Sequence, residues 1–116
     1  MPADQFKPLK IASLELANPL VLAPLSGISD LPFRLLAKEQ RCALVCTEMI
    51  SAEGVLRNRK ATERLLQSRP EERPLAVQIF GSRPMSMGEA AKIIQDGGAD
   101  VLDINMGCPV KKVVRG

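Results

Sequence analysis

The sequence predicts an α/β fold, and within that class the first half of a TIM (β/α)8 barrel. Short apolar runs alternate with helical patterns, which is typical of parallel strands joined by right-handed crossovers. No Gly-x-Gly-x-x-Gly fingerprint follows the first run, which argues against an open, doubly wound dinucleotide-binding sheet. Polar residues instead lie near or after the end of each run, as at the strand ends of a barrel. These residues are Ser26, Glu48, Gln78 and Asn105.

Four buried strands are expected, because continuous apolar runs suit strands that are covered on both faces. A short hairpin is expected before them, around 9–11 and 14–16, as part of a polar lead-in. The predicted strands span 20–23, 43–47, 75–80 and 101–104. A complete barrel has eight βα units in about 250 residues, so this chain supplies about four of them.

Three helical regions connect these strands. Asp30 is expected to cap a helix that continues to about Gln40, and residues 52–68 are expected to form a helix in two pieces. Pro84 is a favourable first-turn residue for a third helix, whose apolar residues follow a helical period. Gly97-Gly98 is expected to end that helix with a left-handed cap.

Composition narrows the class of protein. The chain has 116 residues, 46% of them hydrophobic and 25% charged, which fits one soluble domain. With no histidine and no Cys-x-x-Cys pair, neither a His-based triad nor a metal site is expected. Three cysteines suit no disulfide framework, so we expect a reduced, cytoplasmic protein. No apolar run is long enough for a membrane span, and a net charge of +3 is compatible with a polyanionic partner.

Cys108 and Asn105 are the main candidate functional residues. They follow the strand at 101–104 on a turn that contains Gly107 and Pro109. The carboxyl ends of barrel strands carry the chemistry, so a thiol and an amide there favour a catalytic site over a buried, inert cysteine. Cys42 and Cys46 are interpreted as core or helix–strand junction residues, and their spacing within a strand would place them on the same face.

Four ordered blocks of sequence resemble the tRNA-dihydrouridine synthases, and most of all the bacterial branch. The resemblance extends over about residues 8–116. The blocks are Pro19-Leu-Val-Leu-Ala-Pro-Leu-Ser-Gly-Ile-Ser-Asp-Leu-Pro-Phe-Arg34, Thr47-Glu-Met-Ile-Ser51, Val77-Gln-Ile-Phe-Gly-Ser82 and Asp103-Ile-Asn-Met-Gly-Cys-Pro109, which Val110-Lys-Lys-Val-Val114 extends.

The resemblance implies a flavin-dependent barrel that reduces the C5–C6 bond of uridines in tRNA, with FMN as hydride carrier and NADPH as reductant. It implies that Pro24, Leu25 and Ser26 line the FMN ring and that Gln78 bonds the polar edge of the flavin. Asn105 would then lie between flavin and uracil, and Cys108 would donate the proton to C5. The resemblance also implies that Glu48 lies near the same ring. A cysteine thiol is mostly protonated at neutral pH, so it can act as this acid.

Several alternatives remain open. Residues 1–116 are expected to be the N-terminal part of the barrel, without its second half and without the helical tRNA-binding domain. Such a half-barrel would be inactive alone and would self-associate through exposed strand edges. Another FMN barrel that reduces a free pyrimidine is the rival enzyme. Three basic residues after the cysteine loop suit either RNA contact or solubility; they are Lys111, Lys112 and Arg115.

Overall fold

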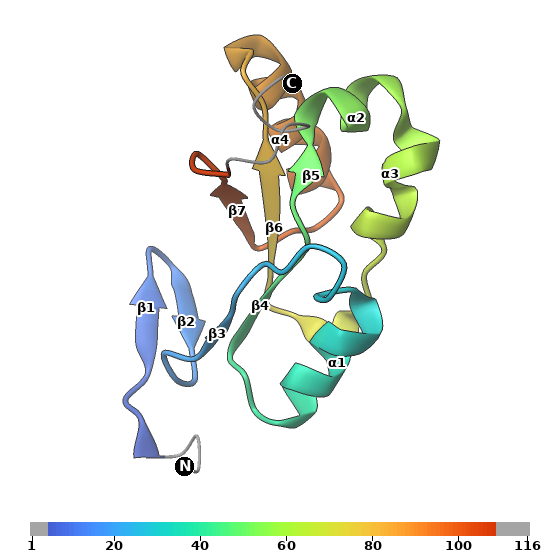
Figure 1. The fold of residues 1–116 in the computed structure, drawn as a ribbon. Coiled ribbons are helices and arrows are strands. Elements are labelled where there is room, and N and C mark those ends of the chain that lie inside the picture. Colours follow the sequence, from blue (N-terminus) through green and yellow to red (C-terminus); the bar gives the residue numbers. More distant parts are fainter. Residues whose placement is uncertain (1–4, 109–116) are drawn as a thin grey trace.

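The computed structural model describes residues 5–108, and the strands of its main sheet run upwards in Figure 1. Lys111, Lys112 and Arg115 lie outside the described residues. The elements in order are β1 (Leu9–Ile11), β2 (Leu14–Leu16), β3 (Val21–Leu22), α1 (Leu31–Glu39), β4 (Leu44–Cys46), β5 (Ile50–Ser51), α2 (Ala52–Arg57), α3 (Arg59–Leu66), the 3₁₀ helix η2 (Pro70–Glu72), β6 (Leu75–Phe80), α4 (Pro84–Asp96) and β7 (Val101–Ile104).

The main sheet is parallel, and its strands are neighbours in chain order. β3 pairs with β4, β4 and β5 pair with successive halves of β6, and β7 pairs with the other side of β6. A doubly wound sheet would reverse its strand order at a switch point, and this sheet does not. The sequential order therefore confirms the predicted barrel class.

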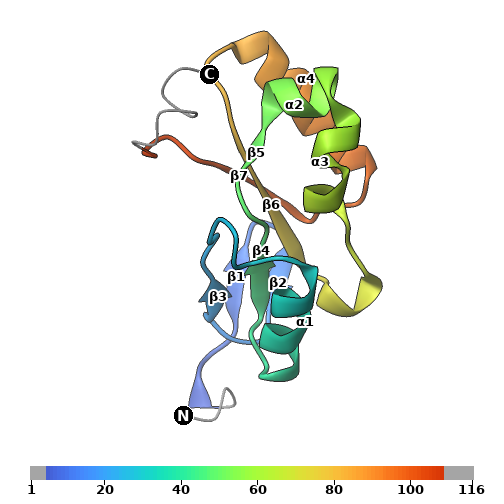
Figure 2. The same ribbon diagram turned by 45° about the vertical axis from the view of Figure 1, so that its right-hand side comes forward.

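Helices α1 to α4 lie on one side of this sheet (Figure 2). Residues that face them alternate along the strands with residues that face the inner side, as the two-residue period of a strand requires. Val45, Val77 and Ile79 pack outwards against Val55 and Ile94 in the larger core. A parallel sheet with its helices on one face is the layer arrangement of a barrel wall.

The β1–β2 hairpin covers the inner face at the amino ends of the strands. Leu16 of β2 is 1% exposed and packs against Leu44, Cys46 and Ala76 in a second apolar cluster. This cluster fills the inner face at the amino ends of the strands. Polar residues on the inner face, such as Gln78, lie farther along the strands, towards their carboxyl ends.

Two helices end in Schellman motifs. In α4 the left-handed residue is Gly98, with φ of +95°, and Ala99 N donates to Ile94 O, which confirms the predicted Gly97-Gly98 stop. In α1 the same position is taken by Arg41, with φ of +67°, and Cys42 N donates to Ala37 O.

The expectation that Cys42 shares a strand face with Cys46 is therefore wrong, whereas the interpretation of Cys42 as a helix–strand junction residue and of Cys46 as a core residue is confirmed. Cys42 completes the end of α1, and β4 begins only at Leu44. The sequence also did not predict β5, which is separate because the chain leaves the ladder between Cys46 and Ile50. Within residues 5–108, none of the helices is both long and apolar enough to cross a membrane.

Candidate active site at the carboxyl ends of the strands

Three polar side chains meet at the inner face where β6 and β7 end. Gln78 pairs in register with Asp103, and Asn105 follows β7 directly. Val101 packs against the inner cluster, so Asp103 and Asn105, two and four residues later, face the same side. The strands thus bring Gln78 and Asn105 together, as predicted.

These side chains form a hydrogen-bonded row. Gln78 Nε2 donates to Asp103 Oδ2 at 2.6 Å, and Asn105 Nδ2 approaches Gln78 Oε1 at 3.4 Å. Gln78 is only 6% exposed, so its amide needs these partners. The row joins a carboxylate to two amides across two neighbouring strands.

The loop that carries Cys108 begins at Asn105, the last member of this row. Asn105 Oδ1 accepts from Gly107 N at 3.0 Å, which folds the loop back on the strand end. Cys108 follows directly and is half-buried, with a free thiol. Asn105 therefore orients the backbone segment that carries the candidate acid.

The second part of the site is the loop after β3. Ser29 Oγ accepts from Leu25 N at 2.9 Å, and Leu25 O accepts from the backbone N–H of both Ile28 and Ser29. Gly27 has φ of +76°, a conformation that glycine adopts without strain. This tight turn leaves Leu25 and Ser26 exposed and Pro24 half-buried.

Glu48 joins this loop to the rest of the site. Its Oε1 accepts from Gly27 N at 2.6 Å, although the residue is only 5% exposed. The next residue, Met49, places its sulfur 3.8 Å from Asn105 Nδ2. Thr47 Oγ1 accepts from Gln78 N at 3.1 Å. The segment between β4 and β5 therefore contacts both the loop and the Gln78–Asn105 row.

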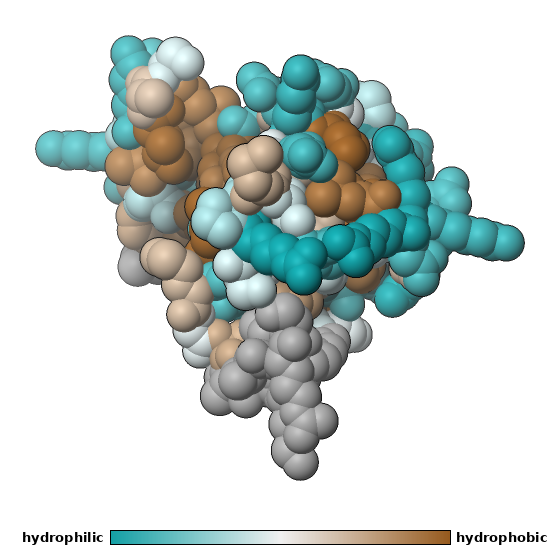
Figure 3. All heavy atoms as spheres, turned by 90° about the horizontal axis from the view of Figure 1, so that it is seen from above, coloured by the Kyte–Doolittle hydropathy of each residue, from teal (hydrophilic) through white to brown (hydrophobic). Residues whose placement is uncertain are grey.

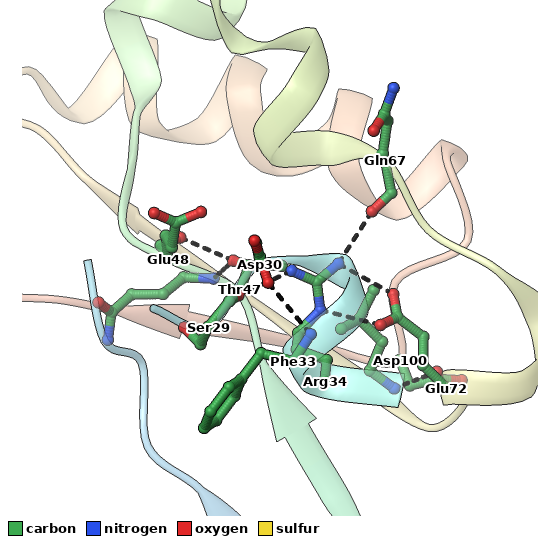
Figure 4. Close-up of polar contacts among 11 residues, drawn as sticks. Ser29, Asp30, Phe33, Arg34, Thr47, Glu48, Gln67, Glu72 and Asp100 are labelled. Carbon is green, nitrogen blue, oxygen red and sulfur yellow. Dashed lines mark hydrogen bonds and ion pairs between the residues drawn. The ribbon is translucent and has the colours of Figure 1, made fainter. Parts of the chain in front are cut away.

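A buried ion pair supports the loop from the helical side (Figure 4). Arg34 is 2% exposed, and its Nε donates to Glu72 Oε2 at 2.9 Å, while Glu72 itself is fully buried. The same guanidinium donates to Ser29 O and to Gln67 O, each at 2.9 Å. One side chain thus links the loop, the end of α3 and η2.

Sequence reasoning missed Asp103, Arg34 and Glu72 as parts of this arrangement. A signal existed for Asp103, because a carboxylate within an apolar strand needs a partner. No comparable signal existed for Arg34 and Glu72, since they are far apart in the sequence and become neighbours only in the fold.

A cleft of about 800 Å³ lies elsewhere, at the amino ends of the strands. It is lined by the hairpin and the end of α1, including Leu16, Asn18, Lys38 and Cys42. Lys38 Nζ donates to Ala43 O at 2.8 Å, and burial lowers the pKa of its ammonium group. The polar row rather than this cleft is the candidate site, because the chemistry of barrels takes place at the carboxyl ends of the strands.

Cys46 is expected to be inert, unlike Cys108. Burial, and next the nearby charge of Asp103, raises the pKa of the Cys46 thiol from 9.0 to about 12. Because the thiolate is the reactive form, iodoacetamide at pH 8 should label Cys108 in the native protein and Cys46 only after unfolding. Peptide mass spectrometry distinguishes the two. Equal labelling of both residues in the native state would contradict this assignment.

The raised pKa of the Cys46 thiol also makes the free energy of unfolding depend on pH. A raised folded-state pKa means that the native state holds the Cys46 proton more tightly than the unfolded chain. The protonated Cys46 thiol therefore contributes fully to the stability of the folded state below pH 9, and this contribution is lost as the pH rises towards about 12.

The fold and the site together define an α/β barrel protein with a polar site at the carboxyl ends of its strands. Residues 21–116 match the family model described as dihydrouridine synthase (Dus). The chain belongs to the dihydrouridine synthase family, which confirms the resemblance seen in the sequence.

Curated relatives support the same family. The chain is 38% identical over 109 residues to a protein of Rickettsia bellii and 40% identical over 109 residues to one of Rhodobacter capsulatus. It is 44% identical over 103 residues to one of Rhizobium leguminosarum bv. phaseoli. Each is named a probable tRNA-dihydrouridine synthase. These matches cover 93%, 93% and 89% of this chain but only 33%, 34% and 32% of the relatives. The chain thus spans about one third of their length.

Proposed function

We propose that residues 1–116 are the N-terminal part of the FMN-binding barrel of a tRNA-dihydrouridine synthase. The full-length protein would reduce uridine in tRNA to 5,6-dihydrouridine with NADPH, in the cytoplasm, where tRNA is found. The observation that carries the proposal is the row formed by Gln78, Asn105 and the Cys108 loop. The family and the printed names of the relatives support the same reaction.

The residues present fit a flavin. Carboxamides offer both donors and acceptors, which match the N–H and carbonyl groups on the polar edge of the flavin ring. Gln78 provides such a group at the inner face, and the Pro24–Ser26 backbone lies in the loop that Glu48 ties to the same end. When bound, FMN would supply the hydride that reaches C6 of the uracil.

The chain's own residues would then position the substrate and deliver the proton. Negative charge develops at C5 and O4 of the uracil, and an acid near C5 must neutralise it. Cys108 would donate this proton. Asn105 would hold the loop that carries Cys108 and would also bind the edge of the uracil. Glu48 would act indirectly, because its carboxylate accepts a hydrogen bond from Gly27 N and so holds the turn that carries Pro24 to Ser26.

The test is a reduction assay with purified full-length protein, FMN and NADPH. An unmodified tRNA transcript and free uracil are supplied separately, and dihydrouridine or dihydrouracil is measured by mass spectrometry. Formation of dihydrouridine in tRNA alone supports the proposal. Reduction of free uracil alone would favour the rival pyrimidine reductase, and no flavin-dependent reduction of either would overturn both.

We also infer that the 116-residue chain, when produced alone, is inactive and self-associates. Val21 and Ile104, on the two edge strands, are each 50% exposed. From the carboxyl ends of the strands, brown apolar patches lie beside hydrophilic side chains (Figure 3). Unpaired edges and apolar surface favour association. Light scattering should give a mass of at least twice 12.6 kDa. A monomer, or flavin-dependent turnover by this chain, would contradict the inference.

A further inference from the structure

Asp103 is a carboxylate in an otherwise apolar strand. Its neighbours Val101, Leu102 and Ile104 are all apolar, and its backbone pairs in register with Gln78. Asp103 is half-buried, and removing a carboxylate from water even in part is costly unless hydrogen bonds compensate it. The 2.6 Å bond from Gln78 Nε2 provides that compensation, and it is shorter than most N–H···O bonds.

This bond determines which way the Gln78 carboxamide points. A carboxylate only accepts hydrogen bonds, so only the NH₂ end of the amide can face Asp103. The carbonyl oxygen is then directed to the other side, where Asn105 Nδ2 lies 3.4 Å away. Asn105 Oδ1 accepts a hydrogen bond from Gly107 N, so the Nδ2 end of the Asn105 amide is the end that faces the Gln78 oxygen.

The orientation also decides what Gln78 can offer a ligand. An amide has two N–H donors and two carbonyl lone pairs, and the row uses one of each. One donor and one acceptor remain, on fixed sides of the group. With the amide reversed, the same edge would present them in the opposite order.

We propose that Asp103 is a positioning residue that fixes the Gln78 carboxamide, and through it the hydrogen-bonding pattern offered to the polar edge of the flavin. The proposal rests on the proposed function for its flavin part. Its orientation part concerns this chain alone. Asp103 does not itself need to touch the cofactor or the uracil.

The experiment compares Asp103→Asn with Asp100→Asn in the full-length protein. Asparagine at 103 keeps the size of the side chain but can either donate or accept, so it no longer selects one orientation. Asp100 is the matched control at the other end of β7, where its carboxylate accepts from Leu75 N at 2.8 Å. Both variants lose a carboxylate that binds a neighbouring strand, but only Asp103 contacts Gln78.

The first readout is the ¹⁵N–¹H signal of the Gln78 side-chain amide, assigned by its loss in Gln78→Leu. In the wild type, one amide proton should be shifted downfield by the carboxylate. That shift should disappear in Asp103→Asn and persist in Asp100→Asn. A wild-type signal without the shift overturns the proposal, however the variants fold.

The second readout is FMN affinity and the visible spectrum of the bound flavin. Asp103→Asn should weaken FMN binding on the order of tenfold, the effect of about one hydrogen bond, and should change the spectrum. Asp100→Asn should leave both unchanged. Unchanged binding and spectrum in Asp103→Asn would overturn the flavin part. Failure of the wild type to bind FMN would instead overturn the proposed function, and the NMR result would still decide the orientation.

Discussion

Replacing Cys108 by alanine in the full-length protein is expected to lower the rate of uridine reduction by about 10²- to 10⁴-fold, the usual contribution of a positioned acid. The flavin should still be reduced by NADPH at the wild-type rate, because that step requires no proton at C5 of the uracil. Rapid-mixing absorbance measures flavin reduction, and single-turnover assays with tRNA measure the second step. A selective loss of the second step identifies Cys108 as the proton donor.

The matched control is Cys42→Ser, which changes a thiol at the end of α1. Cys42 Sγ lies 3.2 Å from Leu44 O, in a packing environment remote from the Cys108 loop. Both half-reactions should remain close to wild type in this variant. If Cys108→Ala reduced tRNA as fast as Cys42→Ser, the role of Cys108 as acid would be wrong.

The second large effect is expected at Glu72. Glu72→Ala removes the carboxylate that pairs with the buried Arg34 guanidinium, and leaves a charge that has no compensating partner at that position. Breaking a buried pair in this way costs about 3–5 kcal/mol of unfolding free energy. Glu72→Gln keeps one acceptor and should cost less. Urea unfolding, followed by circular dichroism, measures both.

A neighbouring surface pair provides the control. Glu71 bonds Arg69 at 2.9 Å, and the two side chains are 57% and 58% exposed. Glu71→Ala should change the unfolding free energy by less than about 1 kcal/mol, as for most exposed pairs. Similar losses for Glu71→Ala and Glu72→Ala would show that the buried network does not stabilise the loop. Because Arg34 also donates to Ser29 O, Glu72→Ala should weaken FMN binding as well.

Local patterns were sufficient to predict most of the fold. The run 75–80 and the run 101–104 are the observed β6 and β7, because short, mainly apolar runs favour strands. The expected burial on both faces is confirmed for β6 but is wrong for β7, in which residues are alternately half-buried and exposed. Pro84 and Gly97-Gly98 mark the ends of α4 because both residues have strong backbone preferences. The predicted strand at 20–23 is shorter in the structure, where β3 spans Val21–Leu22. The extent of such an edge strand depends on its neighbour, which local sequence does not specify.

The arrangement of the candidate site was predictable only in part. The position of Gln78, Asn105 and Cys108 near the carboxyl ends of β6 and β7 was predictable, because strand ends meet at one edge of a parallel sheet. The direction of each side chain was not predictable, since it depends on register across strands, as for Gln78 and Asp103. The support by Arg34 and Glu72 depends on contacts between residues 38 positions apart.

The most direct test of the central claim is a crystal structure of the full-length protein with FMN. The account predicts the flavin ring at the carboxyl ends of the strands, with its polar edge on Gln78 and the Cys108 thiol near the space left for the uracil. Flavin bound instead in the cleft at the amino ends, against Leu16 and Lys38, would contradict it.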